Sequence, residues 1–144
     1  MAKETIAIAG DHAGVAMKGV VKKELEELGY EVLDLGTNGP ESVDYPDFAN
    51  ALVGVLHDGK AKRGVLVCGT GIGVSIAANR HRDIRAALCH DAVTARLARQ
   101  HNDANVLVLG ARITGEEVAK DCVRVFMSTE FEGGRRTRRV AKLG

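Results

Sequence analysis

The chain has 144 residues and a formal net charge of +1, with 45% hydrophobic and 27% charged residues, so we expect a soluble globular protein. The near-neutral charge and the 3% aromatic content give no support for a nucleic-acid partner. No apolar run approaches membrane-spanning length, so we expect no membrane partner either. We predict a single domain over residues 1–144, with an arginine-rich C-terminal segment at 132–144.

Three cysteines occur, at Cys68, Cys89 and Cys122. Their odd number and wide spacing are typical of a reducing compartment and do not suggest a disulfide framework or a zinc site. No signal peptide precedes the first apolar run. We therefore expect a cytoplasmic location.

Strands and helices alternate along the predicted chain. Short apolar runs predict five strands, at Thr5–Ala9, Tyr30–Leu35, Val65–Val67, Ile84–Leu88 and Val106–Leu109. Apolar residues at helical spacing follow each of them, from Val15 to Gly29, Pro46 to Gly59, the turn after Val67 onward, Ala92 to Gln100 and Val118 to Met127. Thr114 is predicted to cap the last of these helices, with Glu117 as its capping-box partner.

Five strand–helix repeats with almost wholly apolar strands indicate a parallel sheet that is covered on both faces. The predicted fold class is therefore α/β, a three-layer Rossmann-like sandwich with a five-stranded parallel sheet. Right-handed crossovers place every strand-to-helix turn at one edge of such a sheet, and ligands bind there.

The turn after the third strand carries Cys68, Gly69, Gly71 and Gly73. Closely spaced glycines let several backbone N–H groups point at one ligand. Those groups and the following helix dipole favour negative charge, and so favour thiolate over thiol at Cys68. The alternative is that Cys68 is a small buried hydrophobic residue.

Other polar residues follow the remaining strands: Asp11 and His12 the first, His90 and Asp91 the fourth, and Arg112 the fifth. His101 and Asn102 instead end the fourth predicted helix, near the opposite edge of the sheet. This misfit suggests that His101 serves a site shared with a second chain. Asp11 could alternatively cap the first helix.

The spacing of residues in known motifs tests several alternative functions. The Gly-Thr-Gly-Ile-Gly sequence lacks dinucleotide-binding spacing, although Asp91 leaves a nucleotide hypothesis open. No Walker motif occurs, and Val74 stands where a cysteine-dependent phosphatase loop needs arginine. No histidine pair has metal-ligand spacing. The arginine-rich tail is either a solvated terminus or a phosphate clamp, with Arg135 and Arg139 on one helical face.

Together the thiol, imidazole, carboxylate, hydroxyl, amides and arginines suit proton abstraction beside a carbonyl of a small phosphorylated substrate. At this point the chain resembles ribose-5-phosphate isomerase type B, within a group that includes galactose-6-phosphate isomerase subunits. The resemblance is carried by five stretches that span nearly the whole chain: Gly10–Gly14, Asp44–Pro46, Cys68–Gly73, Arg99–Asp103 and Glu132–Arg135.

The resemblance implies a homodimer or a dimer of dimers with the site between subunits, and a reaction without metal or other cofactor. It implies interconversion of ribose 5-phosphate and ribulose 5-phosphate through a cis-enediolate. Cys68 would be the base and His101 would open the sugar ring, with Asp11 and Tyr45 in support. The other implied contacts are Thr70 and the amides of Gly69, Gly71, Ile72 and Gly73 with the enediolate, His12, Arg112, Arg135 and Arg139 with the phosphate and substrate, and Asn102 with a hydroxyl.

Two alternatives stay open. The first is an isomerase of six-carbon phosphates such as allose 6-phosphate or galactose 6-phosphate. The second is a non-catalytic sugar-phosphate sensor, which would bind its ligand without turnover.

Overall fold

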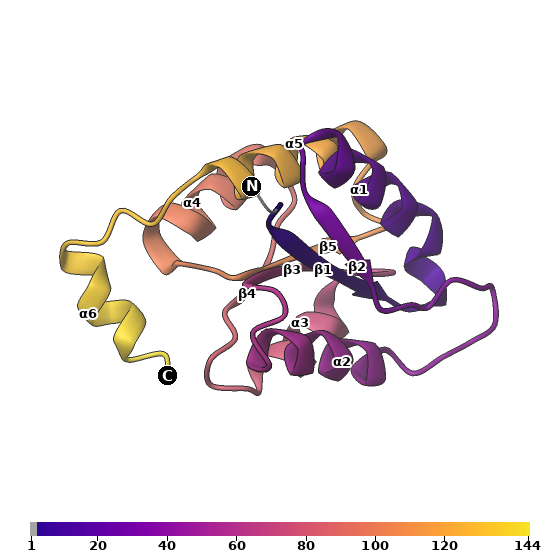
Figure 1. Cartoon of the computed structure of the whole chain (residues 1–144), viewed down its shortest axis with the longest axis horizontal. Helices are drawn as coiled ribbons and strands as arrows, with labels where there is room; N and C mark the ends of the chain where they lie inside the picture. The colour runs from indigo at the N-terminus through magenta and orange to yellow at the C-terminus, as the bar shows by residue number, and fades with distance from the viewer. Residues whose placement is uncertain (1–2) are drawn as a thin grey trace.

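The protein is described by a computed structural model covering residues 3–144. Five strands pair in parallel in the order β2-β1-β3-β5-β4 (Figure 1). The strands are β1 (Thr5–Gly10), β2 (Glu31–Asp34), β3 (Arg63–Cys68), β4 (Ala86–Leu88) and β5 (Val106–Gly110). The helices are α1 (Val15–Glu27), α2 (Tyr45–His57), α3 (Ile72–Asn79), α4 (Ala92–Asn102), α5 (Glu116–Ser128) and α6 (Arg135–Ala141), with a 3₁₀ turn at His12–Gly14. The predicted fold class is confirmed.

Alternating strand residues supply two separate cores. Ile6 and Ile8 of β1 face α1, α4 and α5, whereas Ala7 and Ala9 face α2 and α3. Figure 1 shows these two helical layers above and below the sheet. All four β1 residues are fully buried, which explains why the strands read as unbroken apolar runs.

Two of the three cysteines lie within the first of these cores. Cys89 and Cys122 are buried there, in agreement with their positions inside apolar patterns. Burial raises the pKa of the Cys89 thiol to about 11 and that of Cys122 to about 12. Both groups therefore remain neutral and unreactive near neutral pH.

The strand order reverses between β1 and β3. The chain leaves β1 toward β2 on one side, and β3 leads to the β5 and β4 side of the sheet. α1 covers one face and α3 the other, so the turns after β1 and β3 diverge. A crevice at such a switch point is the usual ligand site of an open α/β sheet.

The predicted cap of α5 is wrong. The helix begins at Glu116 after Gly115, and no side chain caps it. Thr114 is instead drawn into the turn that closes β5, where its N–H donates to the Gly110 carbonyl at 2.9 Å and its side chain is buried. Burial in that turn removes the hydroxyl from the helix end. A capping box does occur one helix earlier, where Asp91 accepts from the Thr94 N–H at 2.7 Å.

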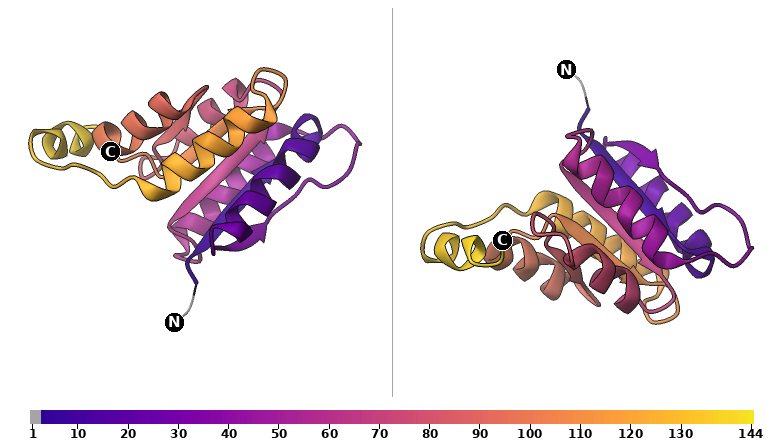
Figure 2. Two further views of the ribbon diagram at one scale, coloured as in Figure 1. Left: turned by 90° about the horizontal axis from the view of Figure 1, so that it is seen from above. Right: turned by 90° about the horizontal axis from the view of Figure 1, so that it is seen from below.

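The arginine-rich tail is helical. α6 lies beside α4, at one end of the molecule and apart from the sheet, as both views of Figure 2 show. The tail is not frayed, because residues 135–141 form a helix, but this helix buries no residue, which fits the solvated interpretation. Within residues 3–144, none of the helices is both long enough and apolar enough to cross a membrane.

Candidate active site

An open cavity of about 500 Å³ lies at the carboxyl edge of the sheet. The turns after β1, β3 and β5 and the start of α2 all contribute to it, as the parallel sheet predicts. It is lined by Asp11, His12, Ala13, Tyr45, Cys68, Gly69, Thr70, Ile72, Gly73, Ile76 and Arg112.

Cys68 forms part of the cavity floor at the last position of β3. Cys68 is only 5% exposed and belongs to the second core, as the alternative of a small buried residue predicts, but it also lines the cavity. The Gly71 N–H donates to Cys68 Sγ at 3.2 Å. The backbone of the glycine turn therefore contacts this sulfur directly.

The Gly71 conformation depends on glycine. Its φ is 81°, in the left-handed region, and a Cβ atom there would lie 2.4 Å from a Leu88 methyl carbon. The next amide, of Ile72, donates to Thr70 Oγ1 at 3.2 Å. Two of the amides expected to face substrate are therefore already bonded, one to the sulfur and one to the threonine hydroxyl.

Asp11 and His12, in the turn that follows β1, form another part of the cavity lining. Asp11 is 8% exposed, and its Oδ1 accepts from the Ala13 N–H at 3.0 Å, which caps the 3₁₀ turn. Asp11 therefore caps this turn and not α1 itself, whose N-cap is Gly14 without a side-chain bond, and the same carboxylate also lines the cavity. His12 Nδ1 accepts from the Val43 N–H at 3.2 Å, so the hydrogen of the neutral ring is on Nε2.

Two glycines make room for larger side chains. A Cβ atom on Gly69 would lie 3.4 Å from the Arg112 guanidinium, which therefore rests on the turn beside Cys68. A Cβ atom on Gly73 would lie 2.6 Å from the Tyr45 ring, so that ring occupies the space that a side chain would need. The missing side chains of the two glycines thus leave space for a cation and a phenol in the cavity that Cys68 lines.

The remaining predicted residues do not line this cavity. His101 and Asn102, at the end of α4, face a second cavity of about 250 Å³ together with Arg136, Arg139, Val140 and Leu143. Because α4 runs antiparallel to the strands, its end lies at the amino edge of the sheet. Asn102 also lines a neighbouring hollow with Arg85 and Ala86, at the start of β4. The predicted site residues therefore form two groups at opposite edges.

Arg136 was not among the predicted residues. It lines the second cavity, with its guanidinium 3.1 Å from Glu132, whereas Arg135 is exposed and does not line it. Residues 136 and 139 are three apart and share a helical face, as 135 and 139 do. Spacing alone could not choose between the two pairs.

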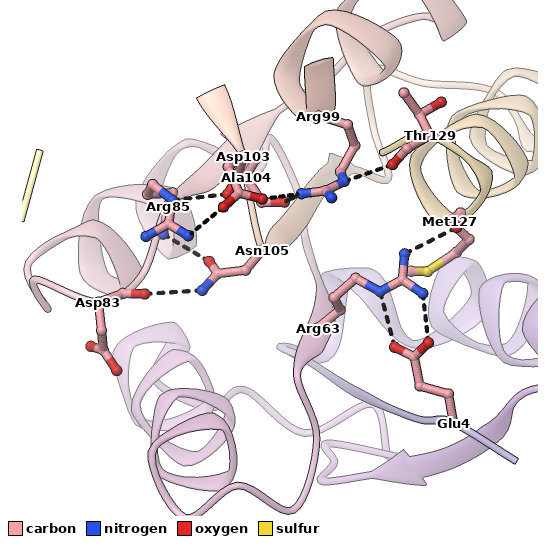
Figure 3. A network of polar contacts seen from close by, with 10 residues as sticks. All are labelled: Glu4, Arg63, Asp83, Arg85, Arg99, Asp103, Ala104, Asn105, Met127 and Thr129. Atoms are coloured by element: carbon pink, nitrogen blue, oxygen red, sulfur yellow. Dashed lines mark hydrogen bonds and ion pairs between the residues drawn. The ribbon is translucent and has the colours of Figure 1, made fainter. Parts of the chain in front are cut away.

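A polar network holds the second group in place (Figure 3). Asp103, in a left-handed conformation with φ of 48°, ends α4 immediately after Asn102. Its carboxylate binds Arg99 at 2.9 Å and Arg85 at 3.4 Å, and Arg99 also donates to the Thr129 carbonyl at 3.0 Å. These bonds fix the end of α4, and with it the backbone positions of His101 and Asn102.

His90 and Asp91 lie outside both cavities. Asp91 caps α4, and its hydrogen bonds to the Thr94 backbone and side chain lower its pKa. Helix capping therefore explains the presence of Asp91, the acidic residue on which the nucleotide hypothesis depended. Among residues 3–144, no three His, Cys, Asp or Glu side chains are grouped so that they could hold a metal ion.

A doubly covered parallel sheet with a thiol, carboxylate, imidazole and guanidinium around one cavity defines an α/β enzyme with the groups for acid–base catalysis. The family model described as Ribose/Galactose Isomerase matches residues 6–143, so the chain belongs to that family and is an isomerase.

Individual relatives agree over nearly the full chain. A crystal structure of a ribose 5-phosphate isomerase from Thermotoga maritima is 53% identical, with a TM-score of 0.95 and 97% of each chain covered. Ribose-5-phosphate isomerase B of Escherichia coli is 44% identical over 94% of this chain and 91% of the relative. D-erythrulose-4-phosphate isomerase of Pectobacterium atrosepticum is 43% identical over 97% and 93%.

Proposed function

We propose that this protein interconverts D-ribose 5-phosphate and D-ribulose 5-phosphate, with Cys68 as the base. The observation that carries the proposal is the Cys68 sulfur on the cavity floor, bonded by the Gly71 amide and surrounded by Asp11, Thr70 and Arg112. The relatives named for ribose 5-phosphate, at 53% and 44% identity, support the choice of substrate.

The proposed step moves one proton between adjacent carbons. The thiolate of Cys68 takes the C2 proton of the open-chain aldose, the C–H electrons form the C1=C2 bond, and O1 becomes anionic. The hydroxyl proton passes from O2 to O1, and the thiol then returns its proton to C1, which leaves a ketone at C2. Donors from the β3–α3 turn stabilise the cis-enediolate because its charge exceeds that of the ground state.

The cationic and polar groups of the cavity suit the other end of the substrate. Arg112 rests on Gly69, and His12 presents its Nε2–H from the opposite wall, so both can donate to phosphate oxygens. Binding energy from the phosphate would hold C1 and C2 near the sulfur. This arrangement supports a phosphorylated rather than a neutral sugar.

We further propose that each active site combines two chains in a homodimer or a dimer of dimers. The Cys68 cavity and the His101 cavity lie at opposite edges of the sheet, so ring opening and proton transfer would not meet within one chain. Ile72 and Ile76 at the Cys68 cavity, and Val93 on α4, are more than half exposed. Such apolar surface beside a cavity suits an interface, which would bring His101, Asn102 and Arg139 of the partner subunit to Cys68.

The direct test is a coupled assay for ribulose 5-phosphate formed from ribose 5-phosphate, with a metal chelator present. Turnover that is unchanged by the chelator supports the proposed metal-free reaction. Binding of ribose 5-phosphate without turnover, with Cys68 kept reduced, would instead indicate a sensor.

A panel of aldose phosphates tests the chain length of the substrate. The relative named D-erythrulose-4-phosphate isomerase is 43% identical, so a four-carbon phosphate belongs in the panel beside allose 6-phosphate and galactose 6-phosphate. The highest kcat/KM is expected for the five-carbon substrate. A higher value for any other would reassign the substrate and leave the proton transfer intact.

A further inference from the structure

Lys18 is a charged residue whose burial the proposed reaction does not explain. Its side chain lies on α1 and is only 2% exposed, although the neighbouring Lys23 is exposed. An ammonium group is rarely buried without an anionic partner, because the loss of its hydration is strongly unfavourable. The position of Lys18 is therefore maintained by specific contacts.

Those contacts join α1 to the segment that leads from β2 to α2. Lys18 Nζ lies 2.6 Å from Asp34 Oδ1 and 2.6 Å from Asn38 Oδ1. Asp34 Oδ1 also accepts from the Gly36 N–H at 2.9 Å. One buried cation thus organises the end of β2 and the first residues of the segment 35–44.

The same segment contacts the part of the Cys68 cavity formed by Asp11 and His12 at two places. The Gly36 carbonyl accepts from the Gly10 N–H at 2.8 Å, and the Thr37 N–H donates to the Gly10 carbonyl at 2.8 Å. Gly10 directly precedes Asp11. Further along the segment, the Val43 N–H donates to His12 Nδ1 at 3.2 Å.

We propose that Lys18 is a positioning residue for the Cys68 cavity. By holding Asp34 and Asn38, it fixes the path of segment 35–44, and the Val43 N–H then keeps His12 in the tautomer whose Nε2–H faces substrate. Lys18 itself does not line the cavity. The role of His12 toward phosphate rests on the proposed function, whereas the His12 tautomer does not.

The test uses Lys18→Met, which removes the charge and retains most of the apolar stem. In the wild-type protein, ¹⁵N-histidine NMR is expected to show His12 with its hydrogen on Nε2, and in Lys18→Met a mixture of tautomers. The KM for ribose 5-phosphate and the inhibition constant of inorganic phosphate should each rise about tenfold, with kcat within about twofold. This split is expected when binding is lost equally in ground and transition states.

The matched control is Glu24→Met, on the same helix. Glu24 is 4% exposed and lies 2.6 Å from Arg124, the same distance that separates Lys18 from Asp34. The two pairs thus each have one buried partner, but the Glu24–Arg124 pair does not contact segment 35–44. We expect a comparable loss of thermal stability with the His12 tautomer and KM unchanged. A purely stabilising role for Lys18 predicts the same result for both variants.

Asn38→Ala provides a second variant if Lys18→Met does not fold. Asn38 is exposed, and its loss leaves the Lys18–Asp34 pair in place. We expect a partial tautomer change and a KM increase of about threefold. A wild-type His12 tautomer in folded Lys18→Met, or in Asn38→Ala if the first is unfolded, overturns the proposal. The NMR result stands even if no isomerase activity is found, so failure of the proposed reaction is recognised separately.

Discussion

The amide nitrogen of Gly71 lies 3.2 Å from the sulfur of Cys68 and is directed at it. The bond closes the tight turn between β3 and α3, and it requires the positive φ of Gly71. The turn therefore contacts the proposed base directly, since the sulfur accepts a hydrogen bond just before the first residue of α3. The proposed base is therefore held in place by the backbone of the turn that carries it.

Replacing Cys68 by alanine should abolish isomerisation without unfolding the protein. The lost group is a small side chain at a cavity floor, while loss of a general base costs about 10³-fold in kcat. We expect kcat/KM in the coupled assay to fall by that order. Cys89→Ala, which removes a thiol from the core, is the control and should retain kcat. A Cys68→Ala enzyme with near-normal turnover would exclude cysteine as the base.

Gly73→Ala should weaken substrate binding through Tyr45. The new Cβ would lie 2.6 Å from the Tyr45 ring, and we expect the ring, which is 42% exposed, to turn away from the cavity. We expect KM for ribose 5-phosphate to rise about tenfold, with the melting temperature little changed. Tyrosine fluorescence should report the moved ring, because the chain has no tryptophan and only two tyrosines.

Gly54→Ala is the matched control for that change. Gly54 lies within α2, and no atom would come within 4 Å of its Cβ. Alanine in an open helical position should stabilise the protein by up to about 1 kcal/mol and leave KM unchanged. Equal KM values for the two alanine variants would contradict the positioning of Tyr45 by Gly73.

The fold was predictable because burial on both faces leaves continuous apolar runs, such as Val65–Val67, between amphipathic helices. The carboxyl-edge residues were predictable for the same reason, since parallel topology alone brings Asp11 near Cys68. The start of α5 was not, because Thr114 has the residue type of a cap but is buried in the preceding turn.

Two further features depend on contacts between residues distant in the chain. Lys18 shares the buried face of α1 with Val21 and Leu25, but no local signal identifies Asp34 and Asn38 as the partners of its ammonium group. His12 and Val43 are separated by 31 positions, so their bond has no local signal. The choice of Arg136 over Arg135 in the second cavity depends on how α6 is rotated against α4, which its spacing does not determine.

Stability should fall at alkaline pH because of the two core thiols. Burial raises the pKa of Cys89 from 9.0 to about 11 and that of Cys122 from 9.0 to about 12. The folded state therefore keeps protons that the unfolded chain releases above pH 9.0, so the stabilisation is complete below that pH and is lost as pH rises through the folded values.

Urea unfolding between pH 8 and 11, which spans the ordinary thiol pKa and the folded value of Cys89, measures this decline. The double variant Cys89→Ala/Cys122→Ala should be less stable at every pH, because two buried side chains are shortened, but its midpoint should fall less steeply with pH. Parallel pH dependence in the wild type and the double variant would show that other groups cause the alkaline loss.

A mixture of two impaired variants should regain activity if the active site is shared between chains. His101→Asn removes the proposed ring-opening group, so it should slow turnover of cyclic ribose 5-phosphate, while Cys68→Ala removes the base. In a heterodimer of the two variants, one site receives both defects and the other has Cys68 from one chain and His101 from its partner. Random exchange of equal amounts makes half of the dimers mixed, so about a quarter of wild-type activity should return.

Refolding the two variants together from denaturant, and separately as controls, allows this exchange. The Lys120→Ala variant, altered on the far side of the sheet from the α2–α3 layer, should give only additive activity when mixed with Cys68→Ala. If the activity of the Cys68→Ala and His101→Asn mixture stays at the sum of its components while the wild type refolds fully, the proposal of a site shared between chains is wrong.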